Sequence, residues 1–371
     1  MTPAPTETLT DTQGSAGRTR GGVISGYVMR CIREQTGLTQ EGLAEQFGVS
    51  VDTVAAWETG RRPITAVPVG HMLVYRNRLL QAGASPDLLT ALDRAMEADV
   101  LLAGVLEGGS AGPHHPLGST VLQRNVVEML TWPLTGRAPA TLDALPKPKR
   151  RGPVATSPEL PAASCRAFFT AVRRAAETAT RPADILTRRQ ALYLVSYDPA
   201  PDTTPWIQHQ QRGRRSQGWL ADGLDARSVA SVAVRQGDTE RMTRFIERTL
   251  VDSDPGETAN LNYWAYWVGE LPRLHGDDAF MAAPVTPGAW CGQRLLAHLV
   301  DHLTPGLGFS ELYVHTLWSL LAVRPHLLQA AGVDTDALRN RVDLLLDGGT
   351  LSAQARRELD GVRYAIRLSR T

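Results

Sequence analysis

The chain has 371 residues, a length that favours two or three domains over one small module. Hydrophobic residues make up 43% of it and charged residues 21%, so it can build a sizeable core, and disorder along the whole chain is excluded. Lys and Arg number 39 against 38 Asp and Glu, a formal net charge of +1, so any contact with nucleic acid must come from a local basic patch.

Cysteine usage and hydropathy exclude several further classes. Cys31, Cys165 and Cys291 are odd in number and far apart, which argues against a disulfide framework and against a cysteine zinc site. No apolar run approaches the ~20 residues that span a bilayer. Residues 1–20 are rich in Thr, Pro and Gly and lack the apolar segment of a signal peptide. We expect a soluble cytoplasmic protein with a disordered tail and no contact with a membrane.

Composition divides the rest of the chain into four parts. Residues 21–80 hold short amphipathic segments separated by Gly and Thr, and residues 81–135 hold longer helical segments that would form a connector. Residues 136–161 are rich in proline and carry the basic run Lys147-Pro-Lys-Arg-Arg151, which predicts an extended linker. Residues 162–371 lack alternating strand patterns closed by tight turns, so we expect them to be helical.

The stretch 37–60 is the most informative, and it predicts two short helices joined by a tight turn. Thr39 can cap the first helix, Gly48 supplies the positive φ of the turn, and Ser50 can cap the second helix. The side chains expected to be buried between the two helices are Leu43, Ala44, Phe47, Val54 and Trp57.

Residues 38–62 read Leu-Thr-Gln-Glu-x-Leu-Ala-x-x-Phe-Gly-Val-Ser-x-x-Thr-Val-x-x-Trp-Glu-x-Gly-Arg-Arg. This pattern resembles the helix-turn-helix of the XRE family, the lambda-repressor-like DNA-binding domains, and the likeness extends over residues 22–80. It implies a helical bundle in which the second helix of the pair enters the major groove of DNA with its N-terminal residues at the base edges.

The resemblance also implies roles for individual residues. The residues placed at DNA are Gln40, Ser50, Val51, Asp52, Thr53, Ala56, Arg61 and Arg62. Arg61 and Arg62 would lie against phosphates, while Trp57 and Glu58 would be structural. Val51 and Ala56 offer only methyl contacts, so specificity is expected to depend on DNA shape, on Gln40 and on the arginines.

The C-terminal part predicts an irregular helical domain. Residues 237–255 resemble the second half of a tetratricopeptide repeat (TPR), but no neighbour recurs at about 34 residues, so a regular array is not supported. The resemblance is to the irregular TPR-like domains that are fused to XRE regulators. The helices expected here span 184–196, 213–236, 238–252, 257–270, 290–303, 309–322, 334–347 and 351–369.

One of these helices is dense in aromatic residues and leaves two interpretations open. It is either a core helix or one wall of a ligand pocket whose candidate residues are Asn260, Tyr263, Trp264 and Trp267. His298 and His302 have a spacing that would suit a metal ion, but no third ligand is obvious, and we expect no metal.

No phosphate-binding loop, dinucleotide fingerprint, nucleophile elbow or kinase signature occurs, so we expect neither an enzyme nor a bound cofactor. The sequence predicts an all-α transcriptional regulator of actinobacterial type that binds double-stranded DNA at the nucleoid. It would act as a homodimer, with a C-terminal domain that dimerises or receives a small-molecule, peptide or protein signal. The alternative is a protein-interaction adaptor that keeps the helix-turn-helix only as a scaffold.

Overall fold

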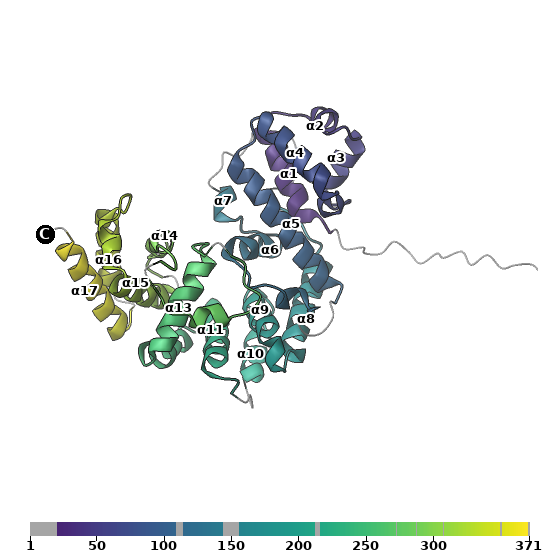
Figure 1. Cartoon of the computed structure of the whole chain (residues 1–371). Helices are drawn as coiled ribbons and strands as arrows, with labels where there is room; N and C mark the ends of the chain where they lie inside the picture. The colour runs from purple at the N-terminus through teal and green to yellow at the C-terminus, as the bar shows by residue number, and fades with distance from the viewer. Residues whose placement is uncertain are drawn as a thin grey trace, which may run out of the picture.

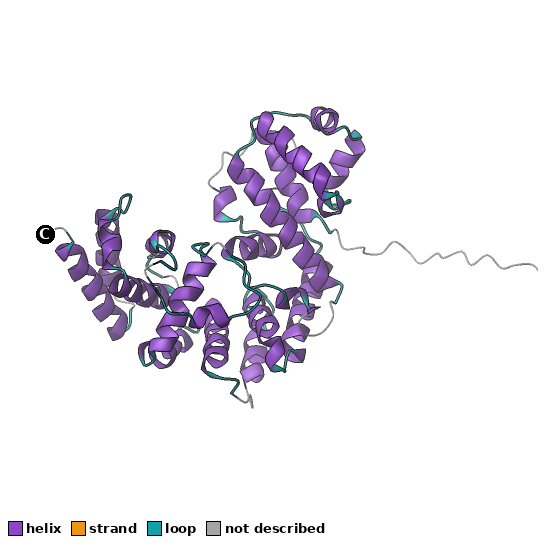
Figure 2. Cartoon of the chain, viewed as in Figure 1, coloured by secondary structure: helices purple, strands orange, loops and turns teal. Residues whose placement is uncertain are grey.

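The computed structural model describes residues 21–108, 114–143, 156–211, 216–271, 273–286, 288–306, 308–348 and 351–369. Within these ranges the chain is helical and contains no strand, which confirms the predicted all-α class (Figure 2). The N-terminal tail at 1–20 and the basic run at 147–151 lie outside the described residues. In the described part, no helix is long and apolar enough to cross a membrane.

The N-terminal bundle contains the predicted helix pair. Thr39 Oγ1 accepts a hydrogen bond from Gly42 N at 3.1 Å, Gly48 ends the first helix with a φ of +70°, and Ser50 Oγ accepts from Thr53 N at 3.2 Å. The predicted caps and turn are thereby confirmed. The elements are α1 Val23–Gln35, α2 Gln40–Phe47, α3 Val51–Glu58, the 3-10 turn η1 Ile64–Ala66, α4 Val69–Gln81 and α5 Pro86–Leu106.

Helix α5 is packed along α1 and closes the bundle. Gly22 precedes α1 and has no side chain to cap it, and the buried Asp99 of α5 takes that role. Its two carboxylate oxygens accept from Ile24 N at 3.0 Å and from Ser25 N at 2.8 Å, while burial raises the pKa of Asp99. The domain boundary expected at residue 80 therefore falls inside one packed unit.

Each helix expected between residues 184 and 369 has a counterpart, but the helices at 162–178 and 203–211 were not among those expected, and a short helix at 140–143 falls in the segment predicted to be an extended linker. The elements after α5 follow in chain order. They are η3 Pro116–Gly118, α6 Arg124–Thr135, α7 Ala140–Asp143, α8 Ala162–Thr178, η4 Pro182–Asp184, α9 Ile185–Val195, α10 Thr203–Gln211, α11 Trp219–Arg235, α12 Glu240–Phe245, the π-helical segment η5 Ile246–Val251, α13 Asp254–Trp267, η6 Ala279–Ala282, α14 Gln293–Asp301, α15 Ser310–Val323, η7 Pro325–Gln329, α16 Thr335–Asp347 and α17 Ala353–Leu368.

These helices pack mainly on their neighbours in sequence and curve into an arc that ends at α17, with the N-terminal bundle standing at the other end (Figure 1). One continuous hydrophobic core runs from α1 through α5, α6, α8 and α9 to Val232 of α11. A second core runs from Ala230 of the same helix to Ile366 of α17. Helix α11 therefore belongs to both cores and joins them.

The predicted helix at 238–252 is present, but its second half has π rather than α geometry. The start of α13 presses against this segment: a Cβ added at Gly256 would stand 1.9 Å from the carbonyl oxygen of Thr249. π-helical turns are rare and frequently occur at functional sites, so this segment is a place to look for one.

Candidate nucleic-acid interface

Helix α3 is fixed in the bundle by its inner face. Val54 and Trp57 are buried, and the ring of Trp57 lies 5.9 Å from that of Tyr75 on α4. Tyr75 in turn stacks on Phe47 of α2 at 4.2 Å between ring centroids. This aromatic cluster ties α2, α3 and α4 together, so the outer face of α3 has a defined orientation.

The outer face of α3 contains the first residues of the helix. Val51 is 39% exposed, Asp52 is exposed and Thr53 is half-buried. Ser50 joins them, since its hydroxyl lies 2.9 Å from the hydroxyl of Thr53. The structure thus brings four of the predicted DNA-binding residues to one surface.

The prediction that Ala56 faces DNA is wrong, because this residue is 2% exposed and belongs to the interior. The C-terminal half of α3 is pressed against α1, where a Cβ added at Gly26 would stand 2.1 Å from the carbonyl oxygen of Trp57. Ala55, which the sequence analysis did not place at this surface, is half-buried next to the exposed residues of α3.

Gln40 at the start of α2 is held by an internal carboxylate. Its Nε2 donates to Glu58 Oε2 at 2.7 Å, and the same carboxylate accepts from Arg33 Nε at 2.5 Å and Nη2 at 3.1 Å. Arg33 also donates to the carbonyl oxygen of Leu38 at 3.0 Å. Glu58 is therefore a structural residue, as predicted, and it fixes the amide of Gln40 at the edge of the α3 surface.

The two arginines that follow α3 fold back over its first turn. Gly60, with a φ of +67°, turns the chain against α1, and the side chains of Arg61 and Arg62 are exposed. Arg61 Nη2 lies 2.6 Å from Asp52 Oδ1, and Arg62 Nη1 lies 3.5 Å from Thr53 Oγ1. The cations thus flank the exposed residues of α3, but one of them is paired with an acid there.

Within the part of the chain that the structure describes, this surface is open. Figure 1 shows α2 and α3 at the end of the N-terminal bundle that points away from the arc of α8 to α17. The extensive packing partners of α3 are α1 and α2. Helix α3 is therefore not covered by the C-terminal helices.

The four candidate pocket residues of the aromatic helix do not share one environment. A cavity of about 280 Å³ lies between α11, η5 and α13, and Asn260 and Tyr263 line it. Trp264 packs instead against His298, and Trp267 packs against Tyr193. Trp264 is buried and Trp267 is partly buried, because their faces of α13 meet α14 and α9.

The histidine pair on α14 has a structural environment. His298 Nδ1 lies 2.8 Å from Arg124 Nη1, and its ring lies 4.2 Å from that of His302. Burial, together with the charge of Arg124, lowers the pKa of His298 to about 3. Among the described residues, no group of three metal-ligating side chains occurs.

Comparison with known proteins adds one finding to this geometry. Residues 26–102 match the family model of a helix-turn-helix domain, a range that runs from α1 into α5. The chain as a whole gives no significant match to a curated protein or to a solved structure. The matched range contains the α2–α3 pair and the helix that caps α1, so the N-terminal bundle is a helix-turn-helix domain.

Proposed function

We propose that the protein is a sequence-specific DNA-binding transcriptional regulator of the XRE type, which places the first turns of α3 in the major groove. The observation that carries the proposal is the open position of α3, with Val51 and Asp52 exposed at the free end of the bundle (Figure 1). A recognition helix must protrude in this way, because the helix itself has to enter the major groove.

The chemistry of this surface favours readout of A·T pairs. The methyl groups of Val51 can contact the methyl group of thymine, and the hydroxyl of Thr53 can bond to any base. Gln40 can make the paired hydrogen bonds that an amide forms with adenine, and Glu58 already orients its side chain. We therefore expect half-sites in which A·T pairs carry most of the specificity.

A homodimer is part of the proposal. One helix-turn-helix contacts one half-site, and useful affinity normally requires two half-sites about one helical turn apart. The C-terminal helices, which lie outside the matched range, would supply dimer contacts, a signal input or both. Their helix pairs support the proposal of an irregular TPR-like domain.

The proposal is tested by selecting binding sites for the full-length protein from random duplexes. We expect one enriched motif with two half-sites separated by about 10 bp, centre to centre. A Val51→Ala, Thr53→Ala double variant should lose that motif, because both changed side chains lie on the outer face of α3. The matched control is Leu73→Ala, an exposed apolar residue of α4 in the same domain, which should retain it.

An adaptor function is the second candidate, and one observation favours it. An apolar groove of about 390 Å³ lies between η1, α4 and α5, where Val69, Leu73 and Val100 are exposed. Exposed apolar surface of this kind often marks contacts with other proteins. The same selection separates the two functions, because an adaptor would enrich no motif.

A further inference from the structure

The cavity between α11, η5 and α13 contains a buried cation that no function described so far uses. Arg227 of α11 is 8% exposed and lines this cavity. Its Nη1 donates to Asn260 Oδ1 at 2.5 Å, and its guanidinium lies 4.3 Å from the ring centroid of Tyr263 and 5.1 Å from that of Trp264. These partners are a neutral amide and two aromatic rings.

Within the described ranges of the chain, Arg227 lacks the carboxylate partner that another buried arginine, Arg189, has. Arg189 of α9 makes two hydrogen bonds to the carboxylate of Asp278, at 2.9 and 2.6 Å. Among the described residues, no carboxylate oxygen lies within 4.0 Å of a nitrogen of Arg227. Burial lowers the pKa of Arg227, which means that its positive charge is poorly compensated. A buried charge without an opposite charge is unfavourable and attracts one.

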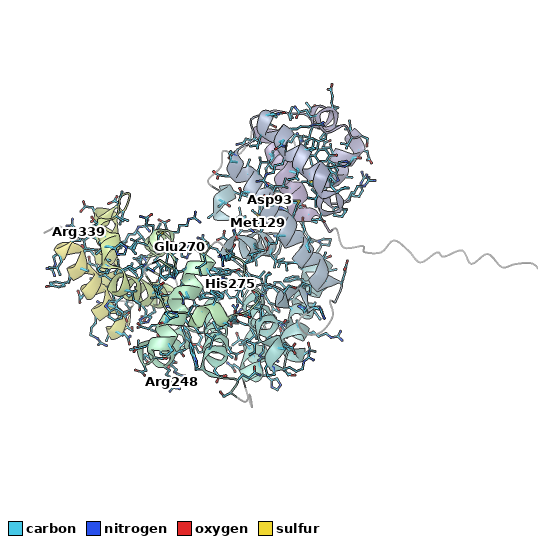
Figure 3. All side chains as sticks on the ribbon, viewed as in Figure 1. Asp93, Met129, Arg248, Glu270, His275 and Arg339 are labelled. Atoms are coloured by element: carbon cyan, nitrogen blue, oxygen red, sulfur yellow. The ribbon has the colours of Figure 1, made fainter. Side chains whose placement is uncertain are left out.

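The rest of the lining adds positive potential. Arg248 of η5 also lines the cavity, and Figure 3 labels it in the lower part of the molecule. The first turns of α11 and α13 both contribute to the wall, and helix N-termini carry partial positive charge. The acid among the described lining residues, Asp222, is exposed and already accepts hydrogen bonds from Ser216 Oγ and Gln217 N.

The remaining walls are apolar and leave room for an organic body. Trp219, Leu224 and Phe245 line the cavity, and Trp219 is half exposed at its mouth. Gly223 and Gly256 are also lining residues, and neither adds a side chain to the space. The volume of about 280 Å³ lies just below the ~300 Å³ at which the usual range for small-molecule sites begins, so it suits a small ligand.

We propose that this cavity binds a small organic anion, with an acidic head group at Arg227 and an aromatic or aliphatic body against the apolar walls. The site would hold α11 and α13 together, and α11 belongs to both hydrophobic cores. An anion bound here is therefore placed to change how the two cores pack, which would make it the signal input of the proposed regulator. The binding itself does not depend on contact with DNA.

The test is isothermal titration calorimetry of the full-length protein, without DNA, against benzoate and 1-naphthoate. Their neutral amides, benzamide and 1-naphthamide, serve as matched controls of the same shape. We expect saturable binding of a carboxylate that is about tenfold tighter than binding of its amide, because a charge-assisted hydrogen bond to Arg227 is lost with the amide. Inorganic phosphate, which lacks an apolar body, should bind more weakly than the carboxylates.

Two variants test the role of Arg227. Arg227→Met keeps an unbranched apolar stem and removes the charged end of the side chain, and it should lose about tenfold in affinity for the carboxylate. Asn260→Asp keeps the shape of the side chain and gives Arg227 a carboxylate partner from the protein itself, so this variant should also lose anion binding. It tests the role of Arg227 even if Arg227→Met fails to fold. The control is Arg235→Met on the same helix, which removes an exposed arginine from Tyr197 outside the cavity and should bind as the unchanged protein does.

Three results would overturn the proposal. They are equal affinity for carboxylate and amide, undiminished carboxylate binding in folded Asn260→Asp, and no saturable binding of either carboxylate. Phosphate binding as tight as that of the carboxylates would show an inorganic anion site and refute the organic ligand class. Because no DNA is present, each result stands apart from the outcome of the duplex selection.

Discussion

Single buried charges connect the helices of the N-terminal domain. The carboxylate of Glu58, on the last turn of α3, accepts hydrogen bonds from Arg33 of α1 and Gln40 of α2. Its side chain is 3% exposed, so water cannot replace these partners. The arrangement of α1, α2 and α3 thus depends on one acid, whose structural role the resemblance implied without naming its partners.

We expect Glu58→Ala to destabilise the protein by about 2–4 kcal/mol, because it leaves the largely buried guanidinium of Arg33 without its carboxylate. Urea unfolding followed by circular dichroism measures the change. Glu45→Ala, at an exposed position of α2, is the control and should change stability by less than about 0.5 kcal/mol. Equal effects of the two changes would contradict the structural role of Glu58.

The pKa of His298, which is about 3 in the folded protein, makes the stability of the protein fall as the pH falls. This value lies below the ordinary value of 6.5, so the unfolded chain binds the proton more readily. Stability contributed by the neutral ring is complete above pH 6.5 and is lost as the pH falls toward 3. The limiting slope is about 1.4 kcal/mol for each pH unit.

The measurement compares the free energy of unfolding at pH 7.0 and 5.5 in His298→Asn and in the unchanged protein. Asparagine keeps an acceptor for Arg124 and cannot take up the proton, so the variant should lose less stability over this interval. His209→Asn, at an exposed position of α10, should keep the slope of the unchanged protein. A slope that His298→Asn leaves unchanged would mean that another group causes it.

At the scale of helices, the sequence predicted where a helix begins and ends better than it predicted which of its side chains point into the core. The caps Thr39 and Ser50 bound α2 and α3 because capping is local chemistry that a few neighbouring residues determine. The inward direction of Ala56 was not predictable, since it depends on the close approach of α1 at Gly26, thirty positions earlier in the chain. The π turns at Ile246–Val251 were missed for a similar reason, because the contact with Gly256 causes no local pattern.

The two cations after α3 should carry part of the phosphate binding. The double variant Arg61→Ala, Arg62→Ala should reduce the slope of log affinity against log salt by about 2, because two phosphate contacts are lost. Fluorescence anisotropy of a labelled duplex at several KCl concentrations measures it. Arg339→Ala with Arg363→Ala removes two partly exposed arginines of α16 and α17 and should leave the slope unchanged. An equal loss in both double variants would argue against a local interface.

The ion pair between Asp52 and Arg61 has an effect of its own on DNA binding. Both side chains are exposed, so the pair contributes about 0–1 kcal/mol to stability, and Asp52→Asn should scarcely change unfolding. It should strengthen DNA binding and steepen its salt dependence, because a charge that repels the phosphates is gone and Arg61 is no longer shared between Asp52 and a phosphate. Glu240→Gln makes the same charge change on α12 and should have neither effect.

The opposite result for Asp52→Asn would be equally informative. Weaker binding to the selected site, with unchanged binding to random duplex, would show that the carboxylate reads a cytosine amino group instead of restraining Arg61. Anisotropy measured on both duplexes separates the two roles of Asp52.

At the scale of the whole molecule, the domain boundaries predicted from composition fall at places where the helices on either side pack together. The segment predicted as a connector supplies α5, whose Asp99 caps α1, and the hydroxyl of Tyr27 in α1 donates to the carbonyl oxygen of Thr156 at 2.7 Å. Arg227 and Asn260, which meet in the cavity, are 33 positions apart. Contacts over such separations leave no trace in local composition, so the candidate pocket was recognised only by its aromatic helix.

The two large hydrophobic cores, which meet at α11 and at Trp267 of α13, predict how the molecule unfolds. Leu102 is buried in the core that contains the helix-turn-helix domain, and Leu320 is buried in the core that ends at α17. Replacing either residue by alanine should cost about 2–5 kcal/mol, since both leave a cavity. Scanning calorimetry should show two transitions, of which Leu102→Ala lowers one and Leu320→Ala lowers the other. Loss of DNA binding on heating should follow the transition that Leu102→Ala lowers, whereas a single transition shifted equally by both variants would mean that α11 couples the cores into one cooperative unit.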